Sequence, residues 1–304
     1  MDAGLIEVAF AGSGVSSCLP MIPMLLTEQE SRGPFVSHPA ETDLKALLSS
    51  AYPDPRDLAR AIAGLRGLGL EKTTAVAAAR NADTDVDLLR RDRCGFAEVI
   101  YGEGKSAEQI LRIMQQLQTA GQDILATRIN RDTANRIVST FPKAEYSNAG
   151  RTIRLMAEND RKQRDCGTVV VLTAGSTDLP VAAESLETLR WMRVPSVLLQ
   201  DAGVAGPHRL QQHLPQLQSA AAIVCVAGME AALPSVVGGY VSCPVIGVPT
   251  SVGYGASLGG ITAMLSMLTC CASNVVCVNI DAGFKGGYTA GLIASRTQHK
   301  GIAP

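Results

Sequence analysis

Two adjacent cysteines, Cys270 and Cys271, stand just before an apolar run, "NVVCVNI", that is typical of a buried strand. An accessible cysteine thiolate is a nucleophile that can form a covalent intermediate with a substrate. A cysteine beside an apolar run is also a common small core residue. If both cysteines lie on the end of one helix, their side chains point about 100° apart, so only one can face a site. The pair therefore poses a choice between packing and covalent chemistry.

Further polar side chains that can bind or catalyse gather in four glycine-containing turns. The turns read "TAGSTDLP" (173–180), "DAGVAGPHR" (201–209), "AGMEAALPS" (227–235) and "VPTSVGYGAS" (248–257). Backbone amides in such turns, at helix N-termini, bind phosphate well. No turn matches the P-loop pattern GxxxxGK followed by Ser or Thr, and none gives a convincing GxGxxG with its downstream acid. The turns therefore favour a nucleotide that is bound outside these standard fingerprints.

Charged and hydroxyl side chains in the first two turns suit an anionic ligand. Arg209 would hold a phosphate or a carboxylate through its guanidinium fork. His208 either bonds a phosphate or caps its helix. The hydroxyls of Ser176 and Thr177 suit a phosphate or a ribose, while Asp178 is either a ligand contact or a helix N-cap.

The last two turns add a carboxylate and a glycine loop. Glu230 stands at the start of a helix, where a carboxylate favours the dipole, and it is also a candidate catalytic group because its turn follows a strand. Gly253 and Gly255 suit close approach of the backbone to a ligand, and Tyr254 either stacks on a ring or covers the turn. The expected substrate-binding residues are Ser176, Thr177, Asp178, Asp201, His208, Arg209, Met229, Thr250, Ser251, Gly253, Tyr254 and Gly255.

Buried strands must position these turns. Apolar runs occur at "TVVVLTAG", "SVLLQDAG", "AAIVCVAG", "PVIGVPT" and "VVCVNID", and each is followed by a turn and a helix-like segment. They recur roughly every 25–30 residues, the length of a strand plus a crossover helix. Continuous Val, Ile and Leu runs indicate strands that are buried on both faces. The sequence therefore predicts an α/β fold with a parallel, doubly wound, three-layer sheet of the flavodoxin or Rossmann type, with ligands beyond the carboxyl ends of the strands.

The segments before this sheet predict a small α/β unit preceded by helices. Strands are expected at 96–104 and 123–130, each followed by a helix, and the first of these helices has Ser106 as its N-cap and Gly121 as its stop. Residues 41–93 have the apolar spacing of helices. We expect an unassigned extension over 1–40, a helical and small α/β domain over 41–157, a charged linker over 158–167, the main α/β domain over 168–296 and a tail over 297–304.

Composition narrows the classes of partner. The formal net charge is −1, which gives no reason to expect nucleic acid or an anionic membrane surface, and aromatic residues make up only 4% of the chain. We expect no segment to span a bilayer, because the apolar stretches are interrupted by glycine, proline and polar residues. The eight cysteines include no CxxC pair and fit neither a zinc site nor a disulfide framework. The plain expectation is a reducing, cytoplasmic setting.

The turn motifs together resemble one known family. Residues 167–290 resemble the PurE-type carboxylase/mutase fold, and the resemblance is much closer to the LarB family. The upstream stretch "RCGFAEVIYGEGKSAEQI" (93–110) is also similar to LarB and has no counterpart in PurE. The motifs that carry the resemblance are "TAGSTDLPVAAE" (173–184), "DAGVAGPHRL" (201–210), "GMEAALPSVVGGYV" (228–241), "PVIGVPTSVGYGASLGG" (244–260) and "VNIDAGFKGGYTA" (278–290).

The resemblance to LarB implies a reaction at a pyridinium ring. LarB enzymes carboxylate C5 of nicotinic acid adenine dinucleotide with CO₂ or bicarbonate and split its phosphoanhydride, giving pyridinium-3,5-biscarboxylic acid mononucleotide and AMP. This is the first step of nickel-pincer nucleotide cofactor synthesis. Cys271 aligns with the reactive cysteine of the family, with Cys270 beside it, and Glu230 is expected to be the base that removes the C5 proton.

The resemblance also implies a metal ion and an assembly. Mg²⁺ is expected to bind chiefly through the substrate phosphates, and Asp178, Asp201 and Asp281 are only candidates, so no metal ligand is assigned. We expect a homo-oligomer, an octamer if the chain assembles as PurE-type domains do.

Two other functions stay open at this point. The first is a purine-type 5-aminoimidazole ribonucleotide carboxylase/mutase of IMP synthesis. These enzymes carry a catalytic histidine just before Leu-Pro, where this chain has Ala232. The second is a non-catalytic nucleotide-binding protein, because "MLTCCAS", Pro207 and Lys285 depart from the usual LarB pattern. Retention of both Cys271 and Glu230 favours activity.

Overall fold

A computed structural model of the chain describes residues 85–157 and 163–297, which belong to one compact unit. The extension expected over 1–40, the helices expected before residue 85 and most of the tail lie outside the described residues. Where the helices expected over 41–93 enter the described part, only α4, Arg90–Cys94, is helical. The backbone N–H of Asp87 is bonded instead to the carboxylate of Glu98, which holds the preceding turn in a non-helical path.

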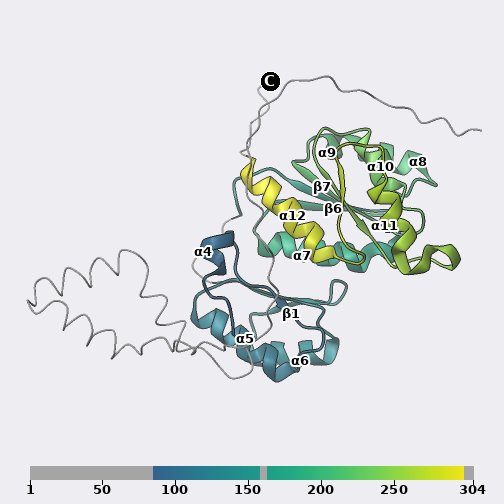
Figure 1. The fold of residues 1–304 in the computed structure, drawn as a ribbon. Coiled ribbons are helices and arrows are strands. Elements are labelled where there is room, and N and C mark those ends of the chain that lie inside the picture. The colour runs from purple at the N-terminus through teal and green to yellow at the C-terminus, as the bar shows by residue number, and fades with distance from the viewer. Residues whose placement is uncertain (1–84, 158–162, 298–304) are drawn as a thin grey trace, which may run out of the picture. The chain divides into compact units, whose positions relative to one another are not determined.

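The first described part is a small α/β unit (Figure 1). Its helix α5, Ala107–Thr119, begins with a capping box, in which the Ser106 hydroxyl accepts from the backbone N–H of Gln109 and the Gln109 side chain accepts from that of Ser106. Ser106 is therefore the N-cap, as the sequence predicts. The other elements are β1 Ile100–Tyr101, β2 Ile124–Thr127, α6 Arg131–Thr140, β3 Glu145–Ser147 and β4 Thr152–Leu155.

The sheet of this unit has four strands in the order β1-β2-β4-β3. Strand β1 is parallel to β2, while β4 is antiparallel to both β2 and β3. The hairpin β3–β4 was not expected from the sequence, because its strands are short and contain Glu145 and Arg154 in place of a continuous apolar run.

The second described part contains a five-stranded, fully parallel sheet in the order β6-β5-β7-β8-β9. The five predicted strands are confirmed. The strands are β5 Val169–Thr173, β6 Ser196–Leu199, β7 Ala222–Ala227, β8 Val245–Pro249 and β9 Val275–Cys277, and the helices between them are α7 Leu179–Trp191, α8 Pro207–Gln211, α9 Leu214–Gln218, α10 Leu233–Gly238, α11 Ile261–Leu268 and α12 Gly283–Arg296.

Helices cover both faces of this sheet, so the predicted three-layer α/β fold is confirmed (Figure 1). Alternate residues of each central strand enter opposite cores, because successive side chains of a strand point to opposite faces. In β5, Val171 packs with the helices α7 and α12, while Leu172 packs with residues of α8, α9, α10 and α11. The burial of both faces explains the continuous apolar runs in the sequence.

Helix α7 is buried from two sides. It contacts β5, β6 and α12 on one side and β2 and β4 of the four-stranded sheet on another. Two acidic residues of this helix, Glu184 and Glu187, are buried and are paired with Arg128 and Arg154 from the small unit. Burial of a carboxylate is costly unless it is paired, so these ion pairs allow α7 to carry charge inside the molecule.

Candidate functional site

The turns after β5, β7 and β8 meet at one edge of the parallel sheet. The backbone N–H of Ala174 donates to the carbonyl of Val226, and that of Thr250 donates to the carbonyl of Ala227. Strand β5 lies between β6 and β7, which is the point where the winding of the chain reverses direction. Ligands of doubly wound sheets bind at such a point, beyond the carboxyl ends of the strands.

A buried bond between Asp178 and Thr250 ties two of these turns together. The Thr250 hydroxyl donates to Oδ1 of Asp178 at 2.8 Å, and the backbone N–H of Gly175 donates to Oδ2 at 2.9 Å. Both side chains are buried. Burial raises the pKa of the Asp178 carboxyl above its ordinary value, against the lowering effect of the hydrogen bonds from Gly175 and Thr250. Asp178 and Thr250, both predicted to bind substrate, are thus bonded to each other within the chain. Their bond fixes the distance between the turn after β5 and the turn after β8.

The turn after β8 is fixed from its other side by Asp281. The backbone N–H of Ser251 donates to Oδ1 of Asp281 at 2.9 Å, and the backbone N–H of Asp281 donates to the carbonyl of Pro249 at 2.8 Å. The Arg128 guanidinium donates to the Asp281 carbonyl and, at 3.1 Å, to the Glu184 carboxylate. The small α/β unit thus supplies a side chain that holds a turn of the candidate site.

Sequence reasoning missed Arg128 and Glu184. Burial raises the pKa of Glu184, and the charge of Arg128 and the backbone N–H of Phe284 oppose that shift. A glutamate in an otherwise apolar helix segment, "PVAAESLETL", was the available signal. Nothing in the sequence indicated that its partner lies 56 residues earlier.

Asp201 and Arg209 form an ion pair at the turn after β6. The Arg209 Nη1 lies 2.6 Å from Oδ2 of Asp201, and both side chains are in part open to solvent. Asp201 has a left-handed backbone conformation with φ 57°, and its N–H bonds the Thr173 hydroxyl at the end of β5. His208 is exposed on the same short helix as Arg209. The Arg209 guanidinium is therefore partly open to solvent and already has a carboxylate beside it.

Glu230 projects from an exposed turn whose backbone is unusual. Its neighbours Met229 and Ala231 both have left-handed backbones, with φ 52° and 51°. Such conformations are uncommon outside glycine and persist only where surrounding structure holds them, often at functional sites. Glu230 itself is exposed, and Ala232 is the N-cap of α10, so no imidazole stands at that position.

The glycine turn that follows β8 is open. Gly253 has φ 151° and Gly255 has φ 54°, and a Cβ at Gly253 would come within 2.3 Å of the Ser257 hydroxyl. Tyr254 between them is 81% exposed, so it does not cover the turn. It remains a predicted stacking partner for a ring.

The two cysteines lie at the other edge of the sheet. Helix α11 runs from the turn after β8 back to the start of β9, and it ends at Leu268. Cys270 and Cys271 therefore lie beyond the end of the helix, so the condition that both stand on one helix is not met. Cys270 is half-buried, with its sulfur accepting from the N–H of Ala272, whereas Cys271 is exposed.

One chain does not bring Cys271 to Glu230. The backbone N–H of Val245, the first residue of β8, donates to the carbonyl of Asn274, so the segment of Cys271 adjoins the amino end of that strand. A strand rises about 3.3 Å per residue, which puts the two edges roughly 16 Å apart across the five residues of β8. Of the predicted residues, only those of the turns are gathered at a common edge.

Most of the other described cysteines are poor nucleophiles. Burial raises the thiol pKa of Cys166, Cys225, Cys243 and Cys277. Among the described residues, no group of three or more His, Cys, Asp and Glu is arranged to hold a metal ion. No helix in the described ranges is long and apolar enough to cross a membrane.

Two family models match successive parts of the chain. Residues 80–158 match the model of the LarB/PurE-like N-terminal domain, and residues 168–301 match that of AIR carboxylase. Two crystal structures of Treponema denticola proteins, a substituted form of PurE2 and PurE, are similar at 20% and 19% identity. Each covers 40% of this chain, with 76% and 77% of their own lengths matched and a TM-score of 0.34.

One relative covers most of the described residues. An uncharacterised protein of Methanocaldococcus jannaschii is 38% identical over 223 residues, which is 71% of this chain and 85% of the relative. With the N-terminal and carboxylase-type models matched in succession, and with the turns and the parallel sheet described above, the chain belongs to the LarB family.

Proposed function

We propose that this protein carboxylates C5 of the pyridinium ring of nicotinic acid adenine dinucleotide and hydrolyses its phosphoanhydride. The products would be pyridinium-3,5-biscarboxylic acid mononucleotide and AMP. The observation that carries the proposal is the turn after β7, which presents an exposed Glu230 and has Ala232 where purine-type enzymes need an imidazole. A carboxylase-type domain with a carboxylate and no histidine suits proton removal from a ring carbon.

The chemistry requires a nucleophile as well as a base. A pyridinium C5 is electron-poor and does not attack CO₂ unaided. Addition of the Cys271 thiolate at C6 forms an S–C bond and turns the ring into a dihydropyridine whose C5 is enamine-like. C5 then bonds to CO₂, Glu230 takes the C5 proton, and the ring regains its aromatic electrons as the S–C6 bond breaks. Water splits the anhydride and releases AMP.

The two catalytic groups must come from different copies of the chain if they act together. Glu230 follows β7 at one edge of the sheet, and Cys271 precedes β9 at the other. We infer a homo-oligomer in which the cysteine edge of one copy faces the glutamate edge of another. Helix α11 has a suitable surface for such an assembly, because Ile261, Leu265 and Leu268 are exposed large apolar residues at helical spacing.

The turns around Glu230 supply groups for the substrate. Arg209, the hydroxyls of Ser176 and Thr177 and the backbone of Gly253 to Gly255 suit the two phosphates and the ribose. Tyr254 is open for stacking. Mg²⁺ would bind chiefly through the substrate phosphates, where it supplies positive charge to the anhydride.

The direct test is product formation. The protein is incubated with nicotinic acid adenine dinucleotide, bicarbonate and Mg²⁺, and mass spectrometry is used to detect AMP and the dicarboxylated mononucleotide. Cys271→Ala and Glu230→Gln are expected to abolish the dicarboxylated product, while Cys270→Ala retains it. Loss of product in Cys270→Ala alone would reject Cys271 as the nucleophile.

A mixing experiment tests the shared site. Neither Cys271→Ala nor Glu230→Gln alone is expected to be active, but co-expressed subunits that assemble at random would rebuild about a quarter of the sites in a symmetric oligomer. A double variant carrying both changes in one chain, mixed with wild type, is the control for subunit exchange. Absence of recovered activity in well-mixed oligomers would refute a site made from two copies.

A second candidate is 5-aminoimidazole ribonucleotide carboxylase, because the residues 168–301 match the AIR carboxylase model. The same assay with that ribonucleotide distinguishes the two enzymes. Binding of nicotinic acid adenine dinucleotide without turnover of either substrate would instead favour a non-catalytic nucleotide-binding protein.

A further inference from the structure

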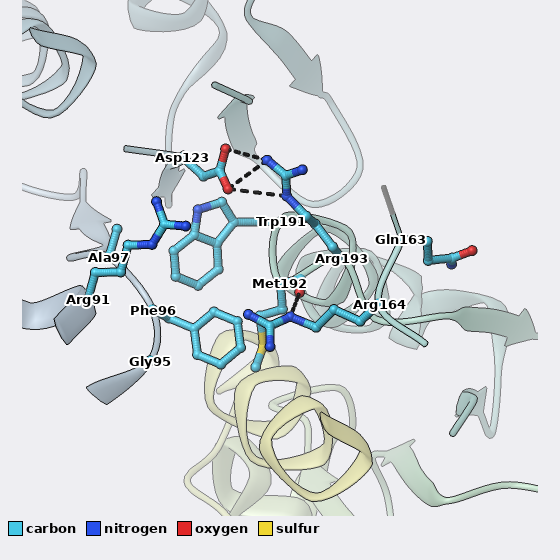
Figure 2. A pocket seen from close by; sticks show the side chains of 10 residues that line it. All are labelled: Arg91, Gly95, Phe96, Ala97, Asp123, Gln163, Arg164, Trp191, Met192 and Arg193. Atoms are coloured by element: carbon cyan, nitrogen blue, oxygen red, sulfur yellow. Dashed lines mark hydrogen bonds and ion pairs between the residues drawn. The ribbon is translucent and has the colours of Figure 1, made fainter. Parts of the chain in front are cut away.

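A separate cavity of about 350 Å³ lies beside the end of α7 (Figure 2). It is lined by Phe96 and Asp123 of the small α/β unit and by Trp191, Met192 and Arg193 at the end of α7. Helix α7 starts at the carboxyl edge of the sheet and therefore ends at the amino edge, where the N–H of Val169 donates to the carbonyl of Pro195. The cavity is thus at the opposite edge from Glu230.

The cavity is also separate from Cys271. Its residues adjoin the starts of β5 and β6, whereas Cys271 precedes β9, and β7 and β8 lie between β5 and β9 in the sheet. At a spacing of about 4.8 Å per strand, this is a separation of roughly 14 Å. None of the groups in the proposed reaction lines the cavity.

The lining carries an excess of positive charge. Three arginines, Arg91, Arg164 and Arg193, face a single carboxylate, Asp123. Asp123 is already engaged, because both of its oxygens accept from the Arg193 guanidinium, at 2.8 and 2.9 Å from Nη2, and the N–H of Ala157 donates to Oδ1. The remaining two guanidinium groups therefore have no counter-charge in the wall of the cavity.

Arg164 and Arg91 are held differently. Arg164 lies over the ring of Phe96, with 4.7 Å from its Cζ to the ring centroid, and donates from Nε to the carbonyl of Met192 at 3.1 Å. These contacts orient the guanidinium and leave its charge unmatched, because it has no ion-pair partner within residues 85–157 and 163–297. Arg91 is exposed, also has no ion-pair partner in those ranges, and points toward the indole of Trp191 in Figure 2.

Trp191 contributes an unused donor. It is 2% exposed, and its Nε1 has no hydrogen-bond partner in the described part of the chain. A buried indole N–H normally finds an acceptor, and leaving it without one costs free energy. An acceptor-rich, negatively charged ligand would satisfy this donor and both guanidinium groups at once.

We propose that this cavity is a second binding site, specific for a small oxyanion, the phosphate or carboxylate group of a metabolite. The oxyanion accepts from Arg91, Arg164 and the indole N–H of Trp191, while the Asp123–Arg193 pair closes one wall. Since the site joins the small α/β unit to the turn after α7, a bound anion links the two parts of the described chain. The assignment rests on contacts of this chain and is independent of the proposed reaction.

The chain contains a probe for this site, because Trp191 is its only tryptophan. The full-length protein is titrated with inorganic phosphate, AMP and nicotinate at constant ionic strength, and Trp191 emission is followed with calorimetry as a second readout. A saturable change with at least one of the three is expected, and the pattern tells a free phosphate from a nucleotide or a carboxylate. No saturable change with any of them would overturn the proposal.

Matched variants separate the site from general surface charge. Arg91→Gln should weaken binding at least about tenfold, because a charge-assisted hydrogen bond contributes on the order of 1.4 kcal/mol or more. Arg90→Gln removes the same charge from the preceding residue, which does not line the cavity, and should change affinity by less than about twofold. Equal weakening in the two variants would overturn the proposal.

Two further variants complete the design. Arg164→Gln should also weaken binding, and circular dichroism checks that it is folded. Glu230→Gln should leave the Trp191 titration unchanged, which separates this site from the proposed catalytic turn. If Glu230→Gln abolished the titration, the anion would be binding at the catalytic turn and the second site would be refuted.

Discussion

Arg128 and Glu184 join the small α/β unit to the core of the parallel sheet through a contact of 3.1 Å between Nε and Oε1. Glu184 is almost fully buried, and its other oxygen accepts from the backbone N–H of Phe284 at the start of α12. The same guanidinium bonds the carbonyl of Asp281, which in turn holds Ser251. One side chain thus connects the first unit with the turn that follows β8.

Arg128→Met is expected to destabilise the protein by about 2 kcal/mol, because it leaves the Glu184 carboxylate buried without its partner. Arg128 is partly exposed, so the cost is below that of a fully buried pair. Urea unfolding measures the change. Arg136→Met is the control, since its pair with Glu108 is exposed and should contribute little to stability. Equal losses of unfolding free energy in the two variants would show that the buried Glu184 pair contributes no more than an exposed pair.

The exposed Cys271 should react with a small thiol reagent much faster than the buried Cys225, whose pKa is raised by burial. The native protein is mixed with a chromogenic disulfide, and the number of thiols that react in the fast phase is measured from its amplitude. Cys271→Ala should lose one fast equivalent, and Cys225→Ala should lose none. An unchanged fast phase in Cys271→Ala would mean that this thiol is covered in the assembled protein.

Asp178 should make the stability depend on pH. Burial raises its pKa in the folded chain above the unfolded value, so between the two values the folded state binds more protons. Stability should therefore fall as pH rises through the folded pKa, and the loss is absent below the unfolded pKa. The difference in unfolding free energy between wild type and Asp178→Asn, measured across the acidic range, isolates this contribution. Parallel curves for the two proteins would contradict it.

Gly287 and Gly291 of α12 provide a matched pair for helix packing. A Cβ at Gly287 would lie 2.6 Å from the backbone carbonyl of Ser185, whereas one at Gly291 would meet the flexible end of Met192. Gly287→Ala is expected to cost about 2 kcal/mol through overpacking. Gly291→Ala should stay within about 1 kcal/mol of wild type, because better helix propensity offsets a shifted side chain. Thermal unfolding of both variants measures the two losses of stability. A larger loss for Gly291→Ala than for Gly287→Ala would contradict the close packing of α12 against the backbone of α7.

The strands of the parallel sheet could be predicted because each is buried on both faces, as in "AAIVCVAG". The hairpin β3–β4 could not, since Glu145 and Arg154 in it are charged and pair across the two strands. Local signals also found the cap at Ser106, whose partners are three residues away. Contacts between distant residues gave no such signal.

The same distinction holds for the candidate site. The turns were predictable because parallel strands end at one edge, which brings Ser176, Glu230 and Thr250 to the same side of the sheet. The separation of Cys271 from Glu230 follows from the direction of α11, which the sequence pattern did not reveal. The bond between Thr250 and Asp178 could not be predicted from the sequence either, because each side chain considered separately suits a ligand.

Helix α7 is shared by both sheets, and this has a consequence for how the protein comes apart. Its buried Glu184 and Glu187 face arginines from the small unit, so neither sheet can separate without exposing a groove lined with acid. The described residues should therefore melt in a single cooperative transition. A fragment that begins after residue 162 would keep the five-stranded sheet. Its helix α7 would then expose Glu184 and Glu187 to solvent as an acidic surface.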